Sequence, residues 1–513
     1  MSKINSVTIV GGGSSGWMTA AAFSKMFPRL KITLVESKNV PIIGVGESSL
    51  ATINHYLEMI ELKDEEWMPS ADATYKTAIK FTNFLSESSS YYDVLKPETS
   101  SIENVSPVDF FLISKLYPDI DITDFSKYFD DTHEMIIQNK LTDRNDVLNW
   151  NFKYDKAYHM DAYKFGLTLK EKIALPNGVV HIEDDVVECT TNNRGEIDSI
   201  ITKNNGALKS DLYIDCTGFK AILIEKTLGV PFESFSDKLI NDRAIATNIP
   251  YVDKEKELNS WTNCTTLKNG WLWNIPVWDR IGAGYVFSSK FVDDETALKE
   301  FKEGLRITYG DRADNIEPKF ISFTPGVRKK PWYKNVLSIG LTSGFLEPLR
   351  STGLMVTHNN IMRAISLLSI KDCFINTIDK ELFNNQSKQE IYNWRDFVIA
   401  HYAFCRRKDS EYWKYVTEEI DYLEDSTEFK NLSTDLDLHS NQLSFNIRIL
   451  TGMGYNPLSD LKIQQLTDRN QINYDFLKHV VQEWKNRNIV ISNHTRTLPS
   501  NLEFLKQKIY KDH

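Results

Sequence analysis

The stretch Ser6-Val7-Thr8-Ile9-Val10-Gly11-Gly12-Gly13-Ser14-Ser15-Gly16 decides the expected fold. A β-branched run ends in three glycines, and a helical pattern follows at residues 17–23. This is G-x-G-x-x-G in its required context of strand, turn and helix. Gly11 permits the tight turn, Gly13 lets a pyrophosphate approach the backbone, and Gly16 lets the helix pack closely. The amides and dipole of the helix start favour phosphates, so we expect dinucleotide binding by Gly11, Gly13, Ser14, Ser15 and Gly16.

A second apolar strand at residues 31–35 ends at Glu36, 20 residues after Gly16. This is the usual place for a carboxylate that binds the adenosine ribose. The alternative is a glycine-rich turn that binds no ligand. Both strands and Glu36 occur at the spacing of the dinucleotide-binding motif, which favours the binding of a ligand. The motif alone does not separate FAD from NAD.

A later strand favours FAD. Residues 211–218, DLYIDCTG, form an apolar run that ends in Cys-Thr-Gly, and short strands at residues 186–189 and 197–201 precede it. In flavoproteins with two dinucleotide-binding folds, such a strand re-enters the first sheet beside the cofactor. The pattern therefore predicts an α/β fold whose sheet is assembled from distant pieces. An ordinary edge hairpin is the alternative.

Composition excludes several classes of protein. The 60 basic and 70 acidic residues are spread along the 513-residue chain without a basic block, which argues against nucleic-acid binding. The sequence contains no run of 18 apolar residues, so a membrane span is not expected. The start, MSKINSVTIVGGG, has no leader pattern, which predicts a cytoplasmic location. Five dispersed cysteines without C-x-x-C argue against a zinc site and a disulfide framework, and no metal is expected.

Several stretches carry a resemblance to a known family: GGGSSGWMTA (11–20), PIIGVGESS (41–49), YKTAIKF (75–81), GWLWNIP (270–276) with RIGAGYVFSS (280–289), and FLEPLRSTG (345–353). In order and spacing they resemble flavin-dependent tryptophan halogenases, from residue 5 to about residue 415. The segment DFVIAHY (396–402) also resembles the helical region of that family. Because Trp-x-Trp-x-Ile-Pro is rare by chance, the chain is identified as a divergent member.

The resemblance implies a Rossmann-like, two-dinucleotide-binding FAD fold with a β-sheet substrate region and a mainly helical C-terminal part. It places the FAD-binding core at residues 1–415 and a helical module over the substrate site at residues 416–513. A separate NAD(P)H flavin reductase would supply FADH2. Reduced flavin and O2 would give a C4a-hydroperoxide that oxidises chloride, bromide or iodide to hypohalous acid. The acid would then reach a lysine beside an electron-rich aromatic substrate.

Residues 75–81 alternate like one half-buried strand, with Lys76 and Lys80 on the same face. By pattern alone, both lysines belong on a solvent-exposed face. The resemblance instead matches Lys76 to the family's catalytic lysine. Its ammonium would hydrogen-bond hypohalous acid, or a neutral amine would form a haloamine, and the sequence leaves both open. We read Lys80 as structural.

Two further stretches match family positions around the flavin. Trp271, Trp273, Ile275 and Pro276 would line a tunnel wall that keeps organic substrate from the flavin, and plain core packing is the alternative. Residues 41–49 would form a strap over the flavin, with Gly44, Gly46 and Glu47 as cofactor-binding residues. A plain turn is the alternative there.

The stretch at residues 345–353 departs from the family at one position. Ser351 matches a residue beside the flavin, Thr352 and Gly353 match the halide site, and Glu347 agrees with the family. Arg350 stands where tryptophan halogenases have a glutamate. It either turns outward and leaves activation to Lys76, or enlarges the positive field that favours halide. In a third account, the site has lost the ability to halogenate a substrate.

The substrate end differs from tryptophan-binding members of the family. Residues 435–455 contain no tryptophan and no paired tyrosines, and a serine-rich segment at residues 86–90 is expected to be a mobile loop. We therefore expect another electron-rich ring, such as an indole, phenol or pyrrole. The alternatives are a FAD-dependent aromatic monooxygenase and a flavin-binding protein without catalysis. The resemblance also implies a homo-oligomer.

Overall fold

The computed structural model describes residues 2–39, 46–96, 114, 126–127, 130–145, 148–422, 448–449, 451–454, 468 and 474–511. The chain divides into two compact units, each assembled from three separate stretches. Unit 1 comprises Met1–Ala73, His159–Asp242 and Ile321–Arg395, and unit 2 comprises Thr74–Tyr158, Arg243–Phe320 and Asp396–His513. The functional boundary expected at residue 415 stays a prediction.

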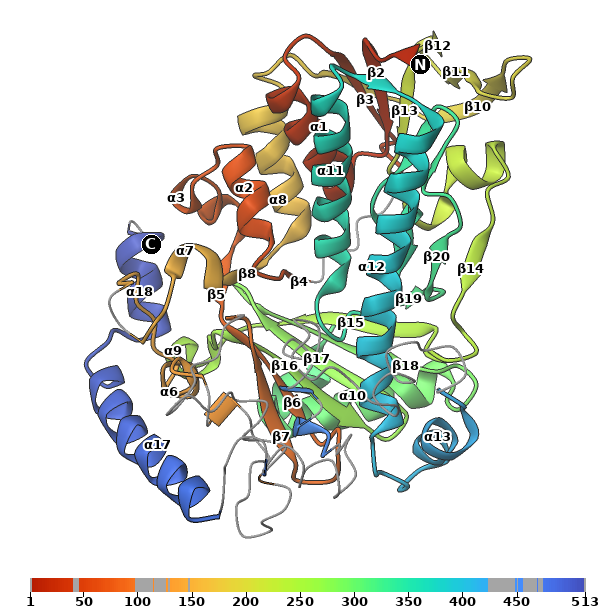
Figure 1. The fold of residues 1–513 in the computed structure, drawn as a ribbon. Helices are drawn as coiled ribbons and strands as arrows, with labels where there is room; N and C mark the ends of the chain where they lie inside the picture. The colour runs from red at the N-terminus through yellow and green to blue at the C-terminus, as the bar shows by residue number, and fades with distance from the viewer. Residues whose placement is uncertain are drawn as a thin grey trace. The chain divides into compact units, whose positions relative to one another are not determined.

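Unit 1 is built on a six-stranded sheet with the order β21-β22-β13-β2-β3-β9 (Figure 1). The strands from β22 to β9 run parallel, and β21 is antiparallel to β22. Their bounds are Ser6–Val10 (β2), Lys31–Glu36 (β3), Val180–Glu183 (β9), Leu212–Asp215 (β13), Trp332–Tyr333 (β21) and Val336–Ser338 (β22). The predicted strand, turn and helix around the glycines are confirmed.

Strand β13 lies inside this sheet, between β2 and β22, with Asp215 opposite Val10. The predicted re-entry is therefore confirmed, and the edge-hairpin alternative is wrong. The two short strands predicted before it are present as β10 (Val186–Thr191) and β11 (Ile197–Thr202), and a third antiparallel strand, β12 (Gly206–Leu208), was not predicted. Strands β2 and β13 are about 200 residues apart in the chain. The hydrophobic pattern of either strand alone therefore could not show that the two strands pair.

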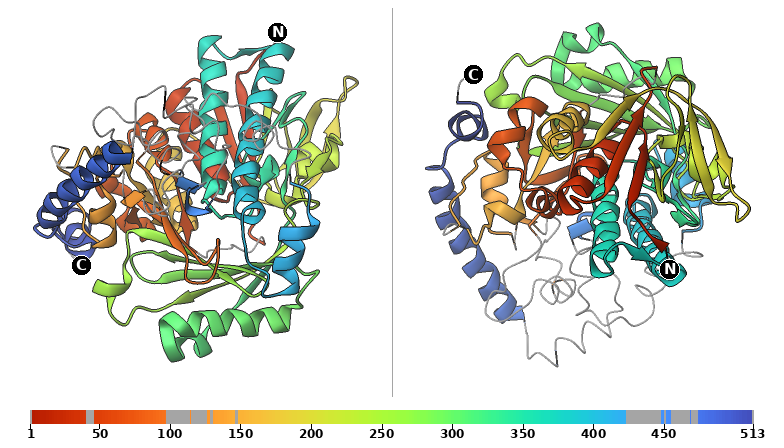
Figure 2. Two further views of the ribbon diagram at one scale, coloured as in Figure 1. Left: turned by 60° about the horizontal axis from the view of Figure 1, so that its bottom comes forward. Right: turned by 90° about the horizontal axis from the view of Figure 1, so that it is seen from above.

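Helix α1 (Ser14–Met26) is the central helix of unit 1. It packs on β2 and β3 and against α8 (Ala162–Leu169) and α11 (Thr352–Ile370) (Figure 2). Its residues from Gly16 to Ser24 are all buried, as expected for a helix without a polar face. Further helices are α2 (Ile53–Met59), α3 (Asp64–Trp67) and α12 (Thr377–Ala403), and α12 confirms the helical region predicted at residues 396–402.

Unit 2 is built on a seven-stranded sheet with the order β19-β15-β18-β17-β16-β6-β7. The bounds are Ala78–Thr82 (β6), Ser90–Val94 (β7), Arg243–Ile249 (β15), Trp261–Leu267 (β16), Gly270–Pro276 (β17), Ile281–Phe287 (β18) and Lys319–Ser322 (β19). Helix α10 (Asp294–Tyr309) covers one face of this sheet, where Phe301 packs against Ile245 and Phe287 (Figure 2). All seven residues of β17 are buried.

The single strand predicted at residues 75–81 is wrong. The segment forms β5 (Thr74–Lys76) and β6, separated at Thr77. Thr77 leaves the alternation because its backbone N and its Oγ1 both donate to the carbonyl of Ser260, at 2.7 and 3.0 Å. Lys76 is fully buried, so the solvent-exposed face predicted for it is wrong as well. Lys80 is half-buried, with its Nζ 5.6 Å from the ring centre of Tyr92.

The serine-rich segment is the hairpin connection between β6 and β7. Within it Ser89 N donates to Ser86 O at 3.1 Å, and Ser88 N donates to Asn83 Oδ1 at 2.9 Å. The described residues beyond 415 are largely helical, in η7 (Tyr415–Glu419), α17 (Tyr474–Thr495) and α18 (Asn501–Lys508), which agrees with the expected helical C-terminal part.

The remaining short elements complete the two units. They are β1 (Ser2–Lys3), β4 (Glu47–Ser48), β8 (Ala157–Met160), β14 (Phe232–Ser234), β20 (Gly326–Arg328), β23 (Gly344–Phe345), β24 (Phe374–Ile375), α6 (His133–Ile137), α7 (Phe152–Asp155), α9 (Lys254–Glu257) and α13 (Glu411–Lys414). Among the described residues, no helix combines the length and apolar character that a bilayer crossing requires.

Candidate active site

Two glycines of the motif are dictated by close backbone packing. Gly11 has φ +112°, and a Cβ there would lie 2.3 Å from the carbonyl oxygen of Cys216. A Cβ on Gly16 would lie 1.9 Å from the carbonyl oxygen of Gly11. Any larger side chain at either position would force β2, β13 and α1 apart.

Gly13 is free of such packing. No atom lies within 4 Å of the position that its Cβ would take, and it is the N-cap of α1 without a side-chain hydrogen bond to the helix. The amides of Ser14 and Ser15 therefore begin the helix beside open space. An uncapped helix start with room for a ligand fits the pyrophosphate of a dinucleotide.

Glu36 lies against the glycine turn at the end of β3. A Cβ on Gly12 would lie 1.7 Å from Glu36 Oε2. On its other side, Glu36 Oε1 is 2.6 Å from His181 Nε2 and 3.6 Å from Lys170 Nζ. These contacts hold the carboxylate beside the motif, where it fits the ribose position.

Asp215 organises the turn that approaches Gly11, and the sequence analysis missed it. Its carboxylate accepts hydrogen bonds from Thr217 N and Oγ1 at 3.1 and 2.6 Å, and from the amides of Leu223 and Ile224 at 2.8 and 2.9 Å. Burial raises the pKa of Asp215, although these hydrogen bonds act in the opposite direction. The signal available in the sequence was an aspartate at the end of an apolar strand.

A glycine near residue 340 was also missed. Gly340 has φ +74°, and a Cβ there would lie 2.5 Å from Ser15 Oγ. Two residues later, Thr342 Oγ1 donates to Gly218 O at 3.1 Å. This turn after β22 therefore closes on both the α1 start and the turn after β13. A glycine directly after a short apolar strand could have indicated it.

The start of α11 combines a buried hydroxyl with open space. Its N-cap, Ser351, has φ +61° and makes no side-chain hydrogen bond to the helix. Thr352 is 2% exposed and its Oγ1 has no hydrogen-bond partner among the described residues, while the Cβ position of Gly353 has no atom within 4 Å. Free amides, a buried hydroxyl and open space at a helix start suit a small anion.

The acid and the arginine of the same stretch are both buried. Glu347 Oε2 accepts a hydrogen bond from Asn241 Nδ2 at 2.9 Å. Arg350 is 4% exposed, and its guanidinium lies 5.1 Å from the centre of the Trp394 ring. The guanidinium does not reach solvent, so an account in which it turns outward to water does not hold.

The strap is described from Gly46 onward, and Gly44 lies outside the described residues. Gly46 is buried with φ +77°. Glu47 follows in β4, opposite Met160 of β8. Burial, together with the smaller effect of the negative charge of Asp161, raises the pKa of Glu47 to about 7. A carboxyl that is half-protonated at neutral pH is unusual, and the group is sensitive to what binds near it.

In unit 2, Lys76 shares its surroundings with Cys264. Burial raises the pKa of the Cys264 thiol to about 12, and the nearby charge of Lys76 acts in the opposite direction. Cys264 stands opposite Trp273 in the β16–β17 ladder. Thr74 Oγ1 donates to the carbonyl of Pro276 at 2.7 Å, which ties β5 to the end of β17.

The two predicted wall tryptophans adjoin one another. Their ring centres are 6.1 Å apart at an interplanar angle of 56°, and both are buried, as are Ile275 and Pro276. The Trp273 ring covers Gly284, where a Cβ would lie 2.0 Å from the ring. The indole N–H of Trp273 is buried and has no hydrogen-bond partner within the described ranges of the chain. Lys76 and the four wall residues thus belong to unit 2, whereas the cofactor and halide candidates belong to unit 1.

Comparisons with known proteins agree with this arrangement. A family model described as tryptophan halogenase matches residues 6–459. The chain belongs to the tryptophan halogenase family. The 7-chloro-L-tryptophan 6-halogenase KtzR of Kutzneria sp. (strain 744) is 32% identical over 425 residues, covering 80% of this chain and 81% of the relative.

Solved structures agree with the family. The apo structure of VirX1 superposes with a TM-score of 0.92 at 38% identity and covers 100% of both chains. BrvH, a flavin-dependent halogenase from Brevundimonas sp. BAL3, superposes with a TM-score of 0.84 at 27% identity, covering 98% of this chain and 99% of that one. The chain is therefore an enzyme of the flavin-dependent halogenase type with the expected α/β fold, and the monooxygenase alternative is not favoured.

The family implies FAD and halide as cofactors. The open space at Gly13, the uncapped start of α1 and the orphaned hydroxyl of Thr352 all fit such ligands. Among the described residues, no three His, Cys, Asp or Glu side chains gather in a cluster that could hold a metal ion, and all five cysteines are free.

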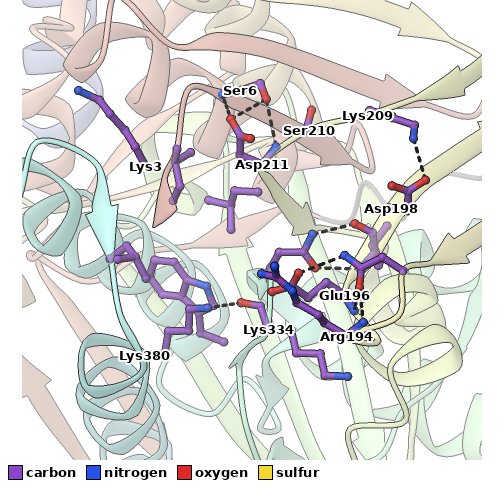
Figure 3. A pocket seen from close by; sticks show the side chains of 17 residues that line it. Lys3, Ser6, Arg194, Glu196, Asp198, Lys209, Ser210, Asp211, Lys334 and Lys380 are labelled. Atoms are coloured by element: carbon purple, nitrogen blue, oxygen red, sulfur yellow. Dashed lines mark hydrogen bonds and ion pairs between the residues drawn. The ribbon is translucent and has the colours of Figure 1, made fainter. Parts of the chain in front are cut away.

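A pocket of about 430 Å³ in unit 1 lies elsewhere (Figure 3). It is lined by Ser6 and Leu212, where β2 and β13 begin, while the glycine turn follows the other ends of these strands. Lys209 pairs with Asp198 at 2.8 Å in its wall, and Asp211 accepts the amide of Ser6 at 3.0 Å. The pocket therefore lies at the ends of β2 and β13 opposite to the glycine motif.

A Gly13→Ala substitution separates ligand binding from folding. Because no protein atom meets the added methyl group, we expect the midpoint of urea unfolding to stay within experimental error of the wild type. The methyl group occupies the space offered to the pyrophosphate, so the Kd for FAD rises about tenfold or more, which corresponds to about 1.4 kcal/mol. Fluorescence titration of FAD measures this. An unchanged Kd in a folded variant would contradict the assignment.

Glu47 predicts a pH dependence of stability. Its folded pKa, about 7, lies above the ordinary value of 4.5, so the folded state holds a proton that the unfolded state has lost between these pH values. The free energy of unfolding therefore falls by about 3 kcal/mol as pH rises from about 4.5 to about 7. Glu47→Gln removes this fall, as urea unfolding across pH will show. Exposed Glu65→Gln is the control and keeps the wild-type profile; an identical profile in both variants would refute the prediction.

Proposed function

We propose that this halogenase transfers an electrophilic halogen to an electron-rich aromatic ring, with Lys76 as the catalytic amine. The observation that carries the proposal is the complete burial of Lys76 on β5, tied to the Trp-x-Trp-x-Ile-Pro strand by the Thr74–Pro276 hydrogen bond. A lysine on a rigid, water-free strand is poised to hold hypohalous acid. A structural lysine would instead extend its charge into solvent.

The FAD-binding residues are those of unit 1 that face open space or fix the turn. The α1 start at Gly13, Ser14 and Ser15 would hold the phosphates and Glu36 the ribose, while Gly46, Glu47 and Ser351 would approach the flavin ring. When bound, the reduced flavin supplies the O2-dependent oxidation of halide to hypohalous acid. A separate flavin reductase using NAD(P)H provides the reduced cofactor.

The halide site is the start of α11. The amide of Gly353 and the Oγ1 of Thr352 would donate to a chloride, bromide or iodide ion, since neither the hydroxyl nor the space is used by the protein. Arg350, buried two residues earlier, adds a cation to this helix start. We infer that it strengthens halide binding in place of the acid found in tryptophan halogenases.

Lys76 would donate a hydrogen bond from its ammonium to the oxygen of hypohalous acid. This withdraws electron density from the O–halogen bond and makes the halogen more electrophilic. The ring carbon then forms a bond to the halogen as the O–halogen bond breaks, and the hydroxide released from the halogen takes up the proton that the ring loses, forming water. Trp271, Trp273, Ile275 and Pro276 would exclude the organic substrate from the place where the oxidant forms, which separates halogenation from hydroxylation.

The substrate is an electron-rich ring other than free tryptophan. KtzR is named as acting on 7-chloro-L-tryptophan, but residues 435–455 of this chain lack tryptophan and paired tyrosines. Indoles, phenols and pyrroles are therefore the substrate classes to test. Five free cysteines agree with a reducing compartment such as the cytoplasm, and the family suggests a homo-oligomer.

The Lys76→Ala variant tests the proposed role. With FAD, a flavin reductase, NADH, O2 and bromide, we expect it to bind FAD and consume reduced flavin normally while halogenated product falls by at least 100-fold, because removing a group that acts in the transition state costs several kcal/mol. Mass spectrometry over a panel of phenols and indoles measures the product. Lys80→Ala, on the neighbouring strand, is the control that keeps activity. Hydroxylated products without halogen from the wild type would support the monooxygenase instead.

Arg350 predicts a halide-specific defect. Replacing it by methionine removes the buried cation near α11, so the bromide concentration at half-maximal rate rises about tenfold, as expected for losing about 1.4 kcal/mol of anion attraction. Arg350→Lys keeps most of the affinity. Unchanged rates and half-maximal concentrations for chloride, bromide and iodide in a folded Arg350→Met variant would rule out this role.

A further inference from the structure

The register of the β6–β7 hairpin relates Lys96 to Lys76 in unit 2 (Figure 1). In this antiparallel ladder Ala78 stands opposite Val94, and Leu95 N donates to Thr77 O at 3.0 Å, which carries the pairing one residue further. Continued one more residue across the break at Thr77, the same register would set Lys96 opposite Lys76 of β5. Directly opposed residues of an antiparallel pair project to the same face, with Cβ atoms about 5 Å apart.

The ammonium of Lys96 is buried without an acceptor. The residue is 2% exposed, and its Nζ has no hydrogen-bond partner in the part of the chain that the structure describes. A buried ammonium without hydrogen bonds is unfavourable by several kcal/mol, and lysines are almost never buried unless paired. Within the described part of the chain, such a group is a candidate to bind an acceptor on a ligand.

Asp130, whose carboxylate interacts electrostatically with Lys96, does not supply that acceptor. Asp130 Oδ1 accepts from Arg448 Nη2 at 2.6 Å and Oδ2 accepts from Arg448 Nε at 2.9 Å, in a buried bidentate pair. The same Arg448 Nη2 donates to the carbonyl of Lys96 at 3.0 Å. Arg448 therefore fixes the backbone of Lys96 and engages both oxygens of Asp130, and the ammonium remains without a bond. His133, the other titratable neighbour of Asp130, pairs with Ser126 Oγ at 2.9 Å through its Nδ1.

We propose that Lys96 binds a carboxylate carried by the aromatic substrate, so that this halogenase acts on aromatic acids. This rests on the proposed function of Lys76. The carboxylate would supply the acceptor that Lys96 lacks and offset its charge, while the ring extends toward the opposed Lys76. A charge-assisted hydrogen bond in a dry site discriminates strongly against a neutral analogue, because the analogue leaves the ammonium unpaired.

The test compares 4-hydroxyphenylacetate with 4-methylphenol, whose rings are similarly reactive and which differ by the carboxylate. We expect the wild type to have the higher kcat/KM for the acid, mainly through KM. In Lys96→Met the ratio of the two kcat/KM values falls at least tenfold, and in Lys96→Arg it stays within a few-fold of the wild type. Lys80→Met, a half-buried lysine of the same hairpin, leaves the ratio unchanged.

Two further measurements keep the outcome decisive. Calorimetric titration of 4-hydroxyphenylacetate into the full chain, without reduced flavin, measures binding of the carboxylate by Lys96 even when no halogenation occurs. A failure of the proposed halogenation is therefore distinguished from a failure of carboxylate binding. Thermal unfolding shows whether each variant folds. We expect Lys96→Met to be at least as stable as the wild type, because it removes an uncompensated charge. The proposal would be overturned if Lys96→Met kept both the wild-type ratio of the two kcat/KM values and the wild-type Kd for 4-hydroxyphenylacetate. It would also be overturned if Lys96→Met kept that ratio and unfolded at a lower temperature than the wild type.

Discussion

The contact between the backbone of Gly11 and the carbonyl of Cys216 is the constraint on which unit 1 depends. It exists because β13 pairs directly with β2, and it leaves room for no side chain at the turn. The same approach aligns the start of α1 with the turns after β13 and β22. The backbone is tightly packed at Gly11, whereas Gly13 adjoins open space. A cofactor at Gly13 can therefore bind the amides of the helix start without displacing protein atoms.

Unit 2 follows a different constraint, the burial of charge. Lys76 and Lys96 are both removed from water, and Arg448 is buried against Asp130. Buried charges are costly unless they are paired or serve a ligand, and Arg448 is paired with both carboxylate oxygens of Asp130. The ammonium of Lys96 has no hydrogen-bond partner in the described part of the chain. In a low-dielectric site, a buried cation would interact with an anionic ligand far more strongly than a surface lysine does.

Two of the proposed site features concern charge. Arg350 near the halide candidates and Lys96 two residues after β7 are both buried cations. Each would make its surroundings more attractive to anions. For a halide this would favour binding, and for an organic substrate it would favour an acid over a neutral ring. The fold itself is that of the tryptophan halogenase family.

The sequence by itself determined the elements whose signals are local. Glycines at fixed spacing after a β-branched strand specify a turn and helix, and the apolar run at residues 211–218 specifies a strand; both are present. Only the tertiary structure decided the burial of Lys76, the break at Thr77, the role of Asp215 and the position of Lys96. Thr77 is held by Ser260, 183 residues away, and Lys96 by Arg448, 352 residues away. Alternation along seven residues reports only local faces, whereas burial depends on what distant segments bring over those faces.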